Sequence, residues 1–148
     1  MAIARGAGTE IIRSHAFEDI STDTHLIIGV QHHIYTVLSI VVYAAALNNA
    51  NSNAQIYLVG YDAYGSDSQQ NIELFYANPQ VAETFVWNDK FSFNGGEPTD
   101  YSGAMNSIAD QDLIADQAVN NSQALKLAPS SSSDDYNVVI TFIDQNNE

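Results

Sequence analysis

Hydrophobic and polar residues alternate along this chain in short stretches that are typical of β-strands. The strongest stretch is Ile34–Tyr43 (IYTVLSIVVY), which is largely apolar at odd and even positions alike. Because both faces are apolar, we expect this strand at the centre of a sheet, with the core on one side and another covering surface on the other. Strict alternation places Ile34, Leu38, Ile40 and Val42 on one face and Tyr35, Val37, Val41 and Tyr43 on the other.

Weaker stretches of the same kind recur along the chain, separated by turns rich in Asn, Ser, Asp and Gly. They are Thr24–Gln31, Gln55–Tyr61, Ile72–Tyr76, Glu83–Trp87, Lys90–Phe93, Leu125–Leu127 and Asn137–Ile143. β-Branched and aromatic residues, which favour strands, are frequent in these stretches. Short strands in this number, without a convincing long helix, predict an all-β fold: an antiparallel β-sandwich that is jelly-roll-like.

Two segments depart from this rhythm. Residues 1–20 are predicted to be an N-terminal arm, loosened by Gly6 and Gly8, in which Glu10–Phe17 forms one strand or lies extended on a partner. Residues 98–122 are predicted to be a loop insertion that holds at most one short helix near Ile108–Val119. The expected organisation is therefore an arm over 1–20 and a single β-sandwich domain over 21–148.

The charge balance narrows the choice of partners. The chain carries 18 Asp and Glu against 4 Lys and Arg, a formal net charge of −14 over 148 residues. Such a body repels phosphate backbones and anionic lipid head groups, so neither nucleic acid nor a membrane is expected as a partner. The longest apolar run, Ile34–Leu47, is shorter than the ~20 residues that span a bilayer as a helix. Because there is no cysteine, stability has to come from the core or from association.

No set of residues predicts a metal site. His32 and His33 are adjacent, so in a strand their imidazoles point to opposite faces, and a shared site with His15 or His25 would need convergence in space. The loop Asp62–Ser68 has oxygen ligands for calcium but lacks the acid pattern of an EF-hand, and a plain turn is the default interpretation. Asp110, Asp112 and Asp116 are interpreted as a solvated acidic loop.

Catalytic chemistry is not expected either. Glu97 and Asp100 could be considered as an acid and base pair for glycoside hydrolysis, but nothing in the sequence predicts the cleft that this reaction needs. The chain has no G-x-S-x-G motif, no Walker A loop and no cysteine nucleophile. We therefore predict that the protein is not an enzyme and that it uses no cofactor.

Tyr57, Tyr61 and Tyr64 cluster around the end of one predicted strand and its loop. Exposed tyrosines can form a sugar-binding face or a protein interface, because each ring has an apolar body and a polar hydroxyl. The same residues could instead close the end of the sandwich core. Sequence alone leaves both interpretations open.

The order of the strongest segments resembles that of small virion proteins of tailed bacteriophages. These segments are Ile34–Tyr43, then Gln55–Tyr61 (QIYLVGY) after an amide-rich turn, and Glu83–Phe93 (ETFVWNDKFSF). The closing element of those proteins, with small and acidic residues before a final strand, is matched by Gln123–Asp144. The resemblance covers roughly half of the chain. This sequence departs from the pattern of those proteins in its first twenty residues and over Pro98–Ser122.

The resemblance implies a virion structural protein that decorates and stabilises the outer surface of a phage capsid (a cement protein), made in the host cytoplasm. Its implied partners are the major capsid protein and further copies of itself in a homotrimer. Shell contacts are expected in the arm, at Ile3, Arg5, Ile11, Ile12, Arg13 and Phe17. Subunit contacts are expected at His32, His33, Tyr35, Val37 and Tyr43.

The resemblance leads to one expectation for the arm and leaves one alternative function. Removal of residues 1–17 should abolish capsid binding and leave the fold intact. The alternative function is a carbohydrate- or receptor-binding module of a phage fibre or tail, which would use Tyr57, Tyr61 and Tyr64 as a stacking face.

Overall fold

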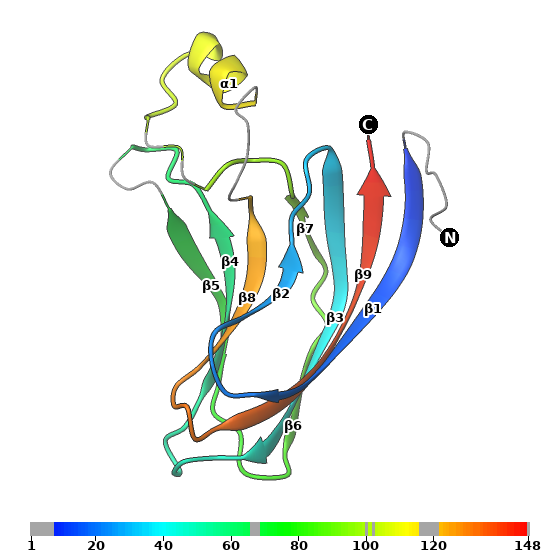
Figure 1. Cartoon of the computed structure of the whole chain (residues 1–148), viewed down its shortest axis with the longest axis vertical. Coiled ribbons are helices and arrows are strands. Elements are labelled where there is room, and N and C mark those ends of the chain that lie inside the picture. The colour runs from blue at the N-terminus through cyan, green and yellow to red at the C-terminus, as the bar shows by residue number, and fades with distance from the viewer. Residues whose placement is uncertain (1–7, 66–68, 100, 102, 116–121, 148) are drawn as a thin grey trace.

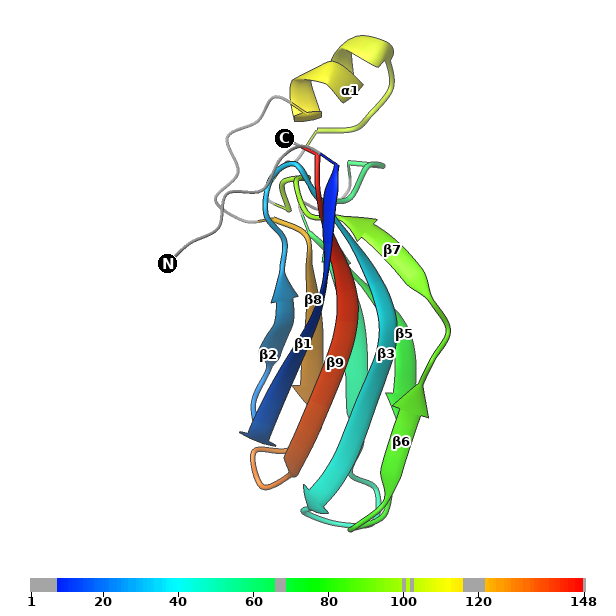
Figure 2. The same ribbon diagram turned by 90° about the vertical axis from the view of Figure 1, so that its right-hand side faces the viewer.

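The chain folds into two antiparallel sheets that pack face to face, as the computed structural model in Figures 1 and 2 shows. The structure describes residues 8–65, 69–99, 101, 103–115 and 122–147. Sheet A has the order β1-β9-β3-β6, and β7 also pairs directly with β3, along residues 34–37, whereas β6 pairs along residues 40–43. Its strands are β1 (Thr9–Ile20), β3 (His33–Ala46), β6 (Thr84–Trp87), β7 (Phe91–Asn94) and β9 (Asp135–Asn146). Sheet B has the order β2-β8-β4-β5. Its strands are β2 (Thr24–Ile28), β4 (Ala54–Gly60), β5 (Gln70–Ala77) and β8 (Ala124–Pro129).

The connections between strands give the sandwich a jelly-roll topology. The chain crosses between the sheets at every connection except those from β4 to β5 and from β6 to β7. As a result, strands from opposite ends of the chain lie side by side: β9 separates β1 from β3, and β8 separates β2 from β4. All of these pairings are antiparallel. The prediction of an antiparallel β-sandwich is confirmed.

The core fills the space between the two sheets and is built by alternation along each strand. On β9, every second side chain from Tyr136 to Phe142 is buried, and the intervening side chains lie on the outer face of sheet A. Leu125 and Leu127 of β8 and Ile56 of β4 supply the facing layer from sheet B. The alternation of apolar side chains along these strands therefore explains which face of each sheet packs against the other.

Strand β3 contains a β-bulge that changes which residues face the core. Tyr35 and Val37 are buried, the register with β9 shifts between Val37 and Ser39, and Ile40 and Val42 are buried after the shift. A bulge inserts one extra residue, so odd positions before it share a face with even positions after it. The predicted separation of Tyr35 and Val37 from Ile40 and Val42 is wrong for this reason.

The structure also corrects the predicted N-terminal arm. Residues 9–20 form β1, which pairs with β9 from Thr9 opposite Asn146 to Ile20 opposite Tyr136. Ile20 is buried, and Phe17 is partly buried against the core. This segment is thus an edge strand of sheet A, while residues 1–7 lie outside the described residues. Removal of residues 1–17 would strip most of β1 from the sheet, so the expectation that it leaves the fold intact no longer holds.

The insertion near 98–122 connects β7 to β8 at one end of the sandwich (Figure 1). It contains helix α1 (Ile108–Ala115), whose first turn is capped because the backbone N–H of Asp110 donates to Ser107 Oγ at 3.2 Å. A β-bridge between Pro98 and Ser122 closes its base. The sequence allowed at most one short helix here, and α1 is that helix. In the described part of the chain, no helix has the length and apolar character needed to cross a membrane.

Candidate functional site

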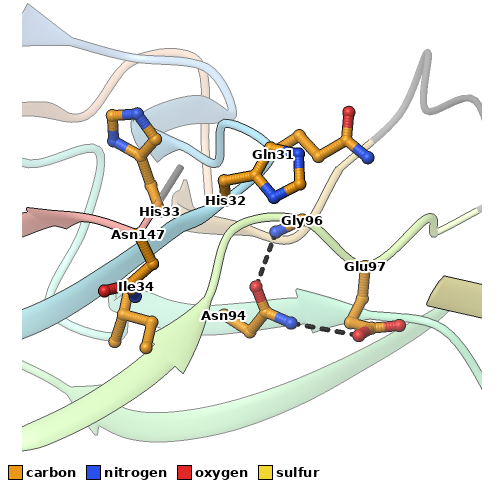
Figure 3. A pocket seen from close by; sticks show the side chains of 8 residues that line it. All are labelled: Gln31, His32, His33, Ile34, Asn94, Gly96, Glu97 and Asn147. Atoms are coloured by element: carbon orange, nitrogen blue, oxygen red, sulfur yellow. Dashed lines mark hydrogen bonds between the residues drawn. The ribbon is translucent and has the colours of Figure 1, made fainter. Parts of the chain in front are cut away.

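A polar pocket opens at the end of the sandwich where the chain turns from β2 into β3 (Figure 3). It has a volume of about 520 Å³ and is lined by Gln31, His32, His33, Ile34, Asn94, Gly96, Glu97 and Asn147. The side-chain oxygen of Asn94 accepts from the Gly96 N–H at 2.9 Å, and its amide donates to Glu97 Oε1 at 3.0 Å. Glu97 lies in the pocket wall, where it is held by this hydrogen bond from Asn94. The pocket therefore offers amide and imidazole groups for contacts, and its side chains are not arranged for a particular reaction.

A charged cluster built around one buried carboxylate lies beside this pocket, where β1, β9 and β3 are neighbours. The Asp144 side chain is only 3% exposed and lies 2.7 Å (Oδ1) from His33 Nδ1 and 3.5 Å (Oδ2) from Arg13 Nη1. A carboxylate at this depth requires such partners, because burial in their absence would penalise its charge. The cluster joins β1, β3 and β9, so its evident role is structural.

The histidines that were considered for a metal site lie in different surroundings. His15 packs its ring edge-on against Phe142 at 5.0 Å, with Nδ1 3.3 Å from the Leu26 carbonyl oxygen, and His33 contacts Asp144. His25 lies on β2, opposite Lys126. Within the described residues, no group of three or more His, Cys, Asp or Glu side chains could hold a metal ion.

The acidic candidates are used locally where the structure describes them. Asp62 accepts from the Tyr64 N–H at 2.9 Å through its side chain, which is an ordinary turn interaction. Asp110 accepts from the Asn106 N–H at 3.1 Å and belongs to the start of α1. Asp112 is exposed on α1, whereas Asp100 and Asp116 lie outside the described residues.

The three tyrosines considered for sugar stacking have different neighbours. Tyr57 donates to Gln55 Oε1 at 2.6 Å, and Lys126 Nζ lies 5.6 Å from the centre of its ring. Tyr61 packs edge-on against Tyr101 at 6.1 Å. Burial, and then the charges of Glu73 and Asp23, raises the pKa of Tyr57, and burial followed by the charge of Glu97 raises that of Tyr61. Tyr64 is 89% exposed. These contacts do not assemble the three rings into one face.

The residues predicted for subunit contacts divide between core and surface. Tyr35 and Val37 are buried in the chain's own core, and His33 points inward to Asp144, so these three do not present a surface to a neighbour. Tyr43 lies on the outer face of sheet A, where it is 36% exposed. His32 is exposed in the turn before β3, with a positive φ of 67°. The bulge in β3 is the reason that this set is divided.

The residues predicted for shell contacts lie on β1 where the structure describes them. Ile12 is 72% exposed on the outer face of sheet A, whereas Ile11 and Arg13 point toward the charged cluster and Phe17 toward the core. Ile3 and Arg5 lie outside the described residues. The segment therefore offers an edge and one face rather than a free arm.

The outer face of sheet A, which is turned toward the viewer in Figure 2, has at its centre a broad uncharged surface that sequence analysis missed. Cross-strand pairing builds it from three neighbouring rows, and we call it the neutral face. The rows are Ile12–Ile143–Thr36–Ser92, Ser14–Thr141–Ser39 and Ala16–Val139–Val41–Val86. The available signal was the lack of charge at alternate positions of β3 and β9, but joining the rows requires knowledge of the strand order.

Comparison with known proteins identifies no family. No family model matches the chain, and no curated protein matches it. Among solved structures, one similar chain comes from Bacillus endospore appendages, described as disulfide-linked pili, with 9% identity, a TM-score of 0.37, and coverage of 100% of this chain and 97% of that one. Another comes from the T13 viral particle of IBDV, with 10% identity, a TM-score of 0.36, and coverage of 99% of this chain and 37% of that one. Similarity at this level assigns the chain to no family and no function.

Proposed function

We propose that this chain is a virion structural protein that decorates and stabilises the outer surface of a phage capsid, docking through strand β1. The observation that carries the proposal is the long edge of β1. In the described residues this strand of 12 residues pairs with β9 along one side, and from Glu10 onward no strand pairs along its other side. Such an edge presents backbone groups to which a strand of a partner can add.

The other sheet edges are less suited to strand addition. On the opposite side of sheet A, β6 and β7 have 4 residues each and are separated by a break. In sheet B, β2 has 5 residues, and the register between β5 and β4 shifts at Tyr57. Short, interrupted and bulged edges are the usual means by which sandwiches avoid unwanted pairing. β1 pairs without interruption from Thr9 to Phe17, and its register shifts only near its end, between Phe17 and Ile20. This longer uninterrupted edge is the exception that a docking role would explain.

The charge of the chain supports an exterior position on the particle. A body with a net charge of −14 is repelled by packaged DNA, and an acidic exterior keeps particles apart in solution. A protein that binds only the assembled shell stabilises it by mass action, in proportion to the logarithm of ligand concentration over Kd. Stabilisation therefore requires neither a catalytic site nor a cofactor.

The proposal is tested by co-sedimentation of the purified protein with undecorated capsids of its source virus, followed by counting of the bound copies. Saturable binding in a fixed ratio to shell subunits, together with a higher temperature of capsid disruption, is the expected result. A protein that stays in the supernatant at every concentration would overturn the proposal. A glycan array would then test the alternative of a fibre or tail module.

A cysteine footprint tests the docking strand separately. Because the chain has no cysteine, a single introduced thiol is unique. Glu10→Cys on β1, exposed and outside the neutral face, should lose reactivity toward a water-soluble maleimide when capsid is added, relative to the free protein. Asn71→Cys on β5, exposed in another edge strand, is the matched control and should keep its reactivity. Capsid binding without protection at position 10 would refute the assignment to β1.

A further inference from the structure

The neutral face differs in kind from the corresponding face of sheet B. Across sheet B, His25, Lys126, Tyr57 and Glu73 follow one another in register, and Lys126 Nζ lies 3.6 Å from Asp23 Oδ2. That outer face carries charge at its centre, as expected for a solvated sheet surface. The three rows of the neutral face carry none, and the acids Glu10 and Glu18 flank them on β1. A chain with a net charge of −14 thus keeps the centre of one sheet face free of charge.

The side chains of the neutral face are accessible and mostly β-branched. Ile12 is 72%, Val86 54% and Val139 43% exposed. Ser14 Oγ and Thr141 Oγ1 lie 3.1 Å apart, as do Thr36 Oγ1 and Ser92 Oγ at 2.8 Å, so the hydroxyls between the apolar positions are paired within the face. Apolar rows on either side of a row of hydroxyls, most of them paired within the face, can be covered at little desolvation cost, and exposed apolar residues gathered on one face mark interaction sites.

We propose that the neutral face packs against the same face of a second copy of this chain. Two bodies that each carry −14 repel each other, so a close contact between copies is favourable only where neither contributes charge. A basic partner would instead be attracted to the acidic surfaces outside this face. When one patch meets itself about a twofold axis, the contact closes as a dimer, rather than the homotrimer expected from sequence.

The uncharged surface of sheet A has about the size that a stable dimer needs. On β9 and β3 it continues past the three rows, through Gln145 and Ile34 at one end and Asn137 and Tyr43 at the other. Four strands about 4.8 Å apart, with about 9 residues of uncharged length at ~3.3 Å per residue, span roughly 19 by 30 Å. The projected area is therefore on the order of 600 Å², at the lower end of the roughly 600–1,000 Å² per partner of a standard protein interface. For two twisted sheets, face-to-face packing at about 30° is the common arrangement.

Analytical ultracentrifugation of the full chain, without capsid, tests the pairing. The wild type should sediment as a dimer. Val139→Glu places a carboxylate at the centre of the face and should raise the dissociation constant roughly 100-fold or more, because an unpaired charge would be buried. Ile72→Glu on β5, at a residue that is 60% exposed, adds the same charge outside the face and should leave the dimer unchanged.

Two additions guard against misfolding as the cause of dissociation. Val86→Glu repeats the perturbation at a more exposed residue on the short strand β6, and thermal unfolding by circular dichroism verifies that each variant is folded. An equimolar mixture of Val139→Glu and Val139→Lys should recover dimers, because opposite charges then face each other across the twofold axis.

Several results would overturn the proposal. They are a wild type that is monomeric or trimeric, a dimer that survives both glutamate substitutions, and a dimer that Ile72→Glu disrupts equally. The pairing goes beyond capsid decoration and is measured without a shell, so a monomeric wild type that still co-sediments with capsids would refute the pairing alone. A dimer that fails to bind capsids would refute decoration alone.

Discussion

Two buried tyrosines in one core are expected to respond in opposite directions to the loss of their hydroxyl groups. The Tyr35 hydroxyl accepts from the Val30 backbone N–H at 3.2 Å, and the residue is 3% exposed. Tyr136 is fully buried at 0% exposure, and its hydroxyl oxygen has no hydrogen-bond partner within the described structure. The two rings are therefore matched in burial and differ in whether the hydroxyl is satisfied.

The expected magnitudes follow from this difference. A buried polar group without a partner costs about 1–3 kcal/mol, whereas a hydrogen bond contributes about 0.5–1.5 kcal/mol net. Tyr136→Phe should therefore raise the free energy of unfolding by about 1 kcal/mol. Tyr35→Phe should lower it by about 1–2 kcal/mol, because it also leaves the Val30 N–H without this acceptor. For a chain of this size, about 1 kcal/mol corresponds to a shift in Tm of roughly 2–4 °C.

Urea unfolding of both variants and the wild type, supported by calorimetry, measures these changes. Equal m-values would establish that the comparison reports stability and not a change in the unfolded state. The reasoning is refuted if Tyr136→Phe is destabilised as much as Tyr35→Phe. That result would mean that the Tyr136 hydroxyl is satisfied in solution by a group that the structure does not include.

Three further outcomes are expected. Burial raises the pKa of Tyr136 from 10.0 to about 12. Its contribution to stability is therefore complete below pH 10 and is lost between pH 10 and about 12, because the unfolded chain ionises first. Alkaline unfolding monitored by circular dichroism should show a smaller loss of stability over this range in Tyr136→Phe than in the wild type. Gly95→Ala should lower Tm strongly in a melting experiment, because the added Cβ would lie 2.6 Å from Tyr35 Cε2 and 2.8 Å from the Val30 nitrogen. Gly8→Ala is the comparison: its Cβ would have nothing within 4 Å, and only the positive φ of 78° would be strained, so it should cost about 1 kcal/mol. Deletion of residues 1–17 should lower Tm or prevent folding, and a truncated chain that melts like the full one would show that β1 contributes little to the sandwich.

The class of the fold followed from local pattern, but several of its details did not. Every strand predicted from alternation is present, because each carries enough apolar side chains to define its inward face. The predicted faces of β3 failed at its bulge, since a single extra residue between Val37 and Ser39 reverses the alternation without any sign in the local composition. Residues 9–20 were predicted to belong to an arm because most of their side chains are exposed at the edge of the sheet, which weakens the apolar alternation. The inward face of β1 also includes Arg13, whose partner Asp144 is brought close only by folding.

The sequence by itself determined that this chain is an acidic, all-β sandwich, because period-two alternation, turn composition and charge are local properties. Only the tertiary structure decided which surfaces the protein presents. The pocket around His32, the cluster at Asp144 and the neutral face each join residues from β1, β3, β7 or β9, and some of these strands lie more than a hundred positions apart along the chain. The physical reason is that strand order and register, set by the packing of the whole core, determine which side chains become neighbours across a sheet.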